Sequence, residues 1–60
     1  MAQMFIEVIT TEIADPDAEP IDRRIIDYHD PRARGWLGKH CYWAFCNGYA
    51  VHTARKFVTD

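Results

Sequence analysis

Residues 30–49, DPRARGWLGKHCYWAFCNGY, decide the fold of this 60-residue chain. Asp30-Pro31 is typical of a helix start, because aspartate caps the first turn and proline fits the first helical position. At the other end of the stretch, Gly48 can adopt the left-handed conformation that terminates a helix, with Asn47 just before it. The sequence therefore predicts one helix between these two signals.

The apolar residues between the two signals recur at helical spacing. They are Ala33, Trp36, Leu37, Cys41, Ala44 and Phe45, with His40 in the same series. At roughly 100° per residue, His40 falls near the centre of the apolar face, with Trp43 at one edge and Cys41 with Phe45 at the other. We expect His40 to be half-buried with one satisfied hydrogen bond, Cys41 to be a small core residue, and Cys46 to be a surface or interface thiol.

A hairpin is the alternative for the end of this stretch, because Asn-Gly between apolar runs is also a strong turn signal. The hairpin would pair Cys46 with Tyr49 and Trp43 with His52. A hairpin would not explain the helix-start signal Asp30-Pro31 or the apolar residues that recur at helical spacing, and we therefore prefer the helix. Its main cost is two internal glycines, Gly35 and Gly38, at about 1 kcal/mol each relative to alanine.

The flanking segments favour strands. Residues 4–13 and 49–58 alternate, and the first of them is rich in β-branched side chains. Residues 14–20 hold two prolines and three acidic residues and are expected to form a loop. Residues 21–29 fit a strand or a short helix, and we favour a strand that pairs back on the first one. The prediction is an α+β fold for residues 1–60 as a single small β-β-α-β domain, with one helix packed on a three-stranded antiparallel sheet.

Composition narrows the function classes. The net charge is −2, which gives no general attraction to nucleic acid. The acidic residues lie mostly in residues 1–30 and the basic residues mostly in residues 31–60, so we expect the two halves to complement each other. No window approaches the roughly 18 apolar residues of a membrane span. Two cysteines without a secretion signal predict reduced thiols and a cytoplasmic location.

Catalytic and metal-binding patterns are weak. The candidate zinc ligands lack the paired spacing of a structural site, and Cys41 and Cys46 point about 140° apart on a helix. Those candidates are His29, His40, Cys41, Cys46 and His52. The chain contains no serine and no glycine-rich phosphate loop, and it is too short to wall a dry pocket. We expect no enzyme activity, no metal and no cofactor.

The far side of the predicted helix is small and aromatic rather than charged. We predict that this side binds another protein, because glycines allow close approach and Tyr, Trp and Arg commonly anchor interfaces. The predicted partner-binding residues are Arg32, Arg34, Gly35, Gly38, Lys39, Tyr42 and Trp43. The expected function is a small protein-binding domain, acting as an accessory regulator or inhibitor of the kind met in phages and mobile elements. The partner is either a second copy in a homodimer or a host or target protein.

The alternative hypothesis is a nucleic-acid-binding module that uses the basic C-terminal half. In that case Arg32, Arg34 and Lys39 would contact phosphates, and Tyr42 or Trp43 would stack on bases. The low count of basic residues and the acidic first half of the chain make this hypothesis the weaker of the two.

Overall fold

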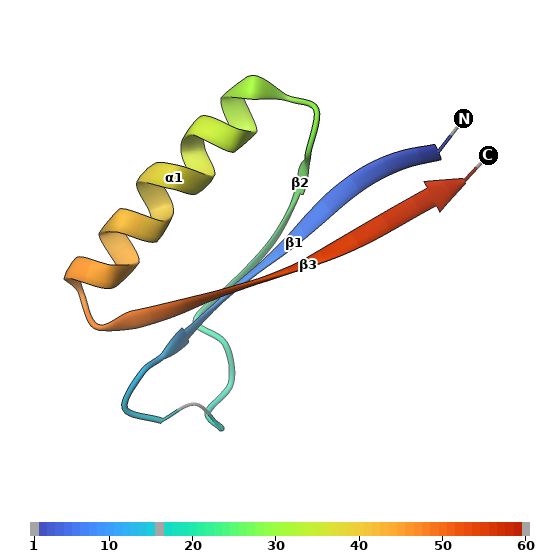
Figure 1. The fold of residues 1–60 in the computed structure, drawn as a ribbon. Coiled ribbons are helices and arrows are strands. Elements are labelled where there is room, and N and C mark those ends of the chain that lie inside the picture. The colour runs from blue at the N-terminus through green and yellow to red at the C-terminus, as the bar shows by residue number, and fades with distance from the viewer. Residues whose placement is uncertain (1, 16, 60) are drawn as a thin grey trace.

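The computed structural model describes residues 2–15 and 17–59; Met1, Asp60 and Pro16 of the predicted acidic loop lie outside it. Its elements follow in the order β1 (Ala2–Glu12), β2 (Asp22–Asp27), α1 (Pro31–Cys46) and β3 (Tyr49–Thr59). One helix packs on an antiparallel sheet of three strands (Figure 1), which confirms the predicted α+β fold. Within the described ranges, no helix has the length and apolar character needed to cross a bilayer.

The first strand is the centre of the sheet, whose order is β2-β1-β3. Val8 of β1 lies opposite Arg24 of β2 and opposite Thr53 of β3. The preferred reading of residues 21–29 is confirmed, because β2 pairs back on β1 over six residues. Strand alternation turns Ile26 inward, where it is buried, and leaves Ile25 on the other face.

The helix begins and ends where the sequence signals predict. The Asp30 side chain accepts a hydrogen bond from the backbone N–H of Arg32 at 2.9 Å, and Pro31 occupies the first helical position. At the C-terminal end, the Asn47 side chain donates to the Trp43 carbonyl at 2.7 Å. Gly48 then turns the chain into β3 with a φ of 81°. The hairpin alternative is wrong, because the helix continues to Cys46 and both of its ends are capped by hydrogen bonds from residues next to them in the chain.

The hydrogen bond between Thr10 and His40 identifies the covered face of the sheet. It places the even-numbered residues of β1 beneath α1, together with the odd-numbered residues of β3 that lie opposite them. Among the described residues, the buried apolar side chains are Val8, Ile26 and Ala44. The molecule is a thin slab of 40 × 23 × 11 Å, because the opposite face of the sheet has no second layer among the described residues.

The predicted core position of Cys41 is wrong, since its side chain is exposed. The placement of Phe45 on the apolar face that packs on the sheet is wrong as well, since its side chain is 80% exposed. The half-buried residues of the helix are Ala33, Trp36, Leu37 and His40. The buried arc of α1 is therefore narrower than its apolar pattern suggests. The reason is that a single layer of three narrow strands covers only one side of the helix, and residues at the edge of the apolar arc reach past it.

Candidate functional site: the outer helix face

The side of α1 that points away from the sheet carries two large exposed aromatic residues. Tyr42 is 74% exposed and Phe45 is 80% exposed. They are three residues apart, so they stand next to each other on the helix surface. Together with the exposed residues Gly35, Gly38 and Lys39 they form what we call the outer helix face.

The two glycines of the outer helix face are not required by the fold. Apart from its chain neighbours and the backbone of its own helix turn, a methyl group added at Gly35 or at Gly38 would meet no atom within 4 Å. Each glycine therefore weakens the helix by about 1 kcal/mol relative to alanine without giving close packing within the chain in return. What the glycines do provide is a shallow surface beside Tyr42, on which another backbone could lie.

The other three predicted partner-binding residues differ in where their side chains lie. Arg32 is exposed in the first turn, and its spacing from Gly35 and Lys39 puts it on the same side of the helix. Arg34 holds its guanidinium 5.8 Å from the centre of the Tyr28 ring, on the connection between β2 and α1. Trp43 turns toward the sheet and stacks on Tyr49 with ring centres 5.3 Å apart. The structure thus brings five of the seven predicted residues to one side of the helix, and it turns the side chains of Arg34 and Trp43 to Tyr28 and Tyr49 instead. The five are Arg32, Gly35, Gly38, Lys39 and Tyr42.

A row of aromatic rings runs along the sheet side of α1. His40 lies between Trp36, with ring centres 4.8 Å apart, and Trp43, with ring centres 5.6 Å apart. The His40 ring also shares a hydrogen bond of 2.7 Å with the Thr10 hydroxyl. The predicted half-buried histidine with one satisfied hydrogen bond is therefore confirmed.

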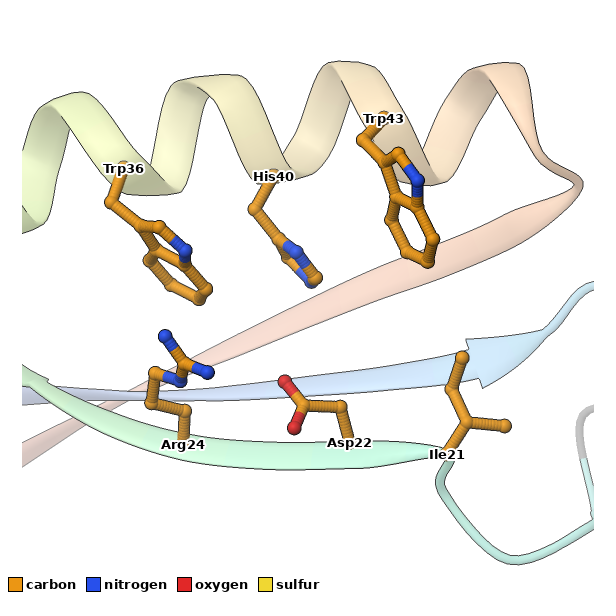
Figure 2. Close-up of a pocket in the computed structure, with 6 residues that line it drawn as sticks. All are labelled: Ile21, Asp22, Arg24, Trp36, His40 and Trp43. Atoms are coloured by element: carbon orange, nitrogen blue, oxygen red, sulfur yellow. The ribbon is translucent and has the colours of Figure 1, made fainter.

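The aromatic row forms one wall of a groove between α1 and β2. In Figure 2 the three rings project from the helix toward β2, while Arg24, Asp22 and the preceding Ile21 line the opposite wall. The cavity measures about 320 Å³. The Arg24 guanidinium lies 4.4 Å from the centre of the Trp36 ring, a cation–π contact that joins the two walls.

The sequence alone does not predict this groove. The signal on the helix was present, because Trp36, His40 and Trp43 are spaced i, i+4 and i+7. The other wall depends on which face of β2 meets the helix, and two adjacent arginines do not indicate that face. Only the register in which β2 pairs with β1 places Arg24 beneath Trp36 and leaves Arg23 on the other face of the sheet.

The groove is poorly suited to stacking on bases. Base stacking needs an open ring face, whereas Trp36 has Arg24 and His40 against it and Trp43 has His40 and Tyr49 against it. Of the two rings that the nucleic-acid hypothesis uses, only Tyr42 is mostly exposed.

Metal-binding and charged groups are dispersed over the molecule. Within residues 2–15 and 17–59, no three His, Cys, Asp or Glu side chains lie together in a way that could hold a metal ion. Cys41 and Cys46 are both exposed thiols. The acidic and basic halves of the chain meet at Glu7 and Lys56, whose charged atoms lie 4.0 Å apart.

Comparison with known proteins gives no guide to function: no family model, no curated protein and no solved structure matches this chain. The function therefore has to be argued from the chemistry of the surface.

Proposed function

We propose that this chain is a small non-enzymatic domain that binds another protein through the outer helix face. The exposure of Tyr42 and Phe45, side by side on a helix with little charge around them, carries the proposal. Aromatic side chains anchor protein interfaces because they contribute a large contact area with few rotatable bonds. Gly35 and Gly38 allow the partner backbone to come close to the helix between those anchors.

The size of the exposed surface supports the proposal that the chain binds a partner. The chain exposes 4674 Å², whereas a compact protein of this mass would expose about 4,000 Å². Its radius of gyration is 12.6 Å, against about 10.4 Å for a compact chain of this length. A domain with so few buried apolar side chains gains stability when a partner covers more of its surface.

A domain of this kind acts by occupying a surface of its target. Such an action fits a regulator or inhibitor, since it requires no reacting group and no enclosed site. The aromatic pair supplies affinity, and Lys39 at the edge of the face favours a target with an acidic rim.

The test is capture of partners by the immobilised chain, followed by affinity measurement with the purified captured protein. The double variant Tyr42→Ala, Phe45→Ala should raise Kd by roughly 10²–10³-fold, since buried aromatic anchors are each worth roughly 2 kcal/mol, or about thirtyfold. Ile25→Ala is the matched control, because it removes an exposed apolar side chain from the sheet and should bind as the parent does. Equal affinity of the double variant and the parent would refute the proposal.

A salt series on the same captured material tests the rival hypothesis. Binding to nucleic acid that weakens steeply with salt, and that is lost in Arg32→Ala, Arg34→Ala, would favour a nucleic-acid-binding module instead.

A further inference from the structure

The third strand has a long unoccupied edge. β3 extends over eleven residues, and in the part of the chain that the structure describes its partner in the sheet is β1 alone. The second strand pairs with residues 5–10 of β1. The beginning of β1 and the end of β3 therefore project past β2 and α1 as a two-stranded ribbon, as Figure 1 shows near the termini. A two-stranded ribbon is marginal in water and needs further pairing or cover.

The hydrogen-bond pattern shows which groups point to this edge. The N–H of Tyr28 donates to the carbonyl of Met4 at 3.1 Å, so the even-numbered residues of β1 bond toward β2. Because antiparallel strands alternate, the odd-numbered residues of β1 bond toward β3. The odd-numbered residues of β3 must then direct their N–H and C=O groups outward. They include Val51, Thr53, Arg55 and Phe57.

We propose that this edge pairs with the β3 of a second copy, antiparallel about a two-fold axis at Ala54. In an antiparallel pair, the residues whose N–H and C=O groups point outward from each strand must lie opposite one another. Near the middle of the strand, a two-fold axis at Thr53, Ala54 or Arg55 meets this condition. A centre at Arg55 would set two guanidinium groups directly opposite each other, which is unfavourable. A centre at Thr53 would place Val58 of each copy opposite Gly48, which precedes β3.

The Ala54 centre aligns all eleven residues of β3 with their counterparts. It places Val51 opposite Phe57 of the second copy, and Ala50 opposite Val58. Both pairs are apolar, and Phe57 is 66% exposed in the single chain. Small side chains meet at the axis itself, because Ala54 faces its own copy. β3 contains no acidic residue, and in this register no lysine or arginine lies opposite another lysine or arginine.

The second copy also covers the projecting ribbon. Phe57 lies on the face of the sheet that carries α1, but α1 crosses from the end of β2 to the start of β3 and leaves that end of β3 bare (Figure 1). In the proposed dimer, Phe57 lies beside Val51 of the second copy, near the end of that copy's helix. The two sheets become one continuous sheet, with both helices on the same side.

The chain exposes enough surface to form such a dimer interface. The surface in excess of a compact monomer, about 600 Å² per chain from the size relation, is of the same order as the roughly 800 Å² that each partner contributes to a standard interface. This contact does not involve the outer helix face, so either contact can exist without the other.

The test combines mass in solution with one charge substitution on each sheet edge. Ala54→Lys and Ile25→Lys both add a lysine opposite Glu7 on the same sheet face, one on the β3 edge and one on the β2 edge. We expect the parent and Ile25→Lys to be dimers by light scattering, and Ala54→Lys to dissociate with a Kd raised about tenfold or more. Because the control carries the same charge beside the same glutamate, misfolding caused by the charge would affect both variants.

Amide exchange in the unmodified chain gives a second readout. In the dimer the N–H groups of Thr53 and Arg55 should be protected as strongly as those of His52 and Ala54, and they should lose protection on dilution. A parent chain that is monomeric at NMR concentration would overturn the proposal. So would a dimer broken by Ile25→Lys, which locates the contact at β2, or a dimer broken only by Gly38→Arg, which locates it at the outer helix face.

Discussion

Replacing the two mid-helix glycines by alanine should stabilise the domain and weaken its binding. Both positions are inside α1, and a methyl group added at either one meets nothing within 4 Å. The change therefore removes the backbone entropy cost of glycine without creating a clash. Gly35→Ala and Gly38→Ala should each raise the free energy of unfolding by about 1 kcal/mol. For a domain of this size, each such change raises Tm by roughly 4–8 °C.

Gly48→Ala provides the matched control. It makes the same chemical change and also meets no atom within 4 Å, but its φ is 81°. A residue with a Cβ in that left-handed conformation costs roughly 1–2 kcal/mol. Thermal and urea unfolding of the three single variants should therefore show two increases in stability and one decrease.

Binding is the second half of this experiment. If the glycines serve close approach of a partner, Gly38→Ala should bind the captured partner more weakly although it is the more stable protein. A loss of stability in Gly35→Ala and Gly38→Ala would refute the helix argument. Higher stability with unchanged affinity would refute the interface argument.

Three further substitutions test the fold, each measured by urea unfolding. Asp30→Ala removes the helix cap and should cost about 1 kcal/mol, while Asp30→Asn should cost much less; equal losses would show that the cap does not matter. Val8→Ala empties part of a fully buried site and should cost about 2 kcal/mol, so a loss below half of that would contradict the assigned core. His40→Phe keeps the ring stack but leaves the buried Thr10 hydroxyl without its partner, at a cost of about 1–3 kcal/mol. Adding Thr10→Val to His40→Phe should recover part of that loss, and no recovery would show that the hydrogen bond does not contribute.

The sequence by itself determined the elements of this protein. The helix boundaries were readable because Asp30, Pro31, Asn47 and Gly48 act through hydrogen bonds and dihedral angles within a few residues of themselves. Strands β1 and β3 were readable because alternation is a local property of an extended chain. The exposed character of Gly35, Gly38 and Tyr42 also followed from helical geometry alone.

Only the tertiary structure decided how much of each element is covered. The apolar pattern predicted a buried Cys41, but burial depends on the width of the sheet beneath the helix, and a single layer of three strands is too narrow. In the same way, Arg24 and Trp36 meet because β2 pairs with β1 in one register.

The unpaired edge of β3 is also a tertiary property. A strand carries no local signal of whether one neighbour or two will pair with it, because that depends on the strand order of the whole sheet. The physical reason is the same in each case: hydrogen bonds near the backbone are set within a few residues, whereas burial and pairing depend on segments far apart in the chain.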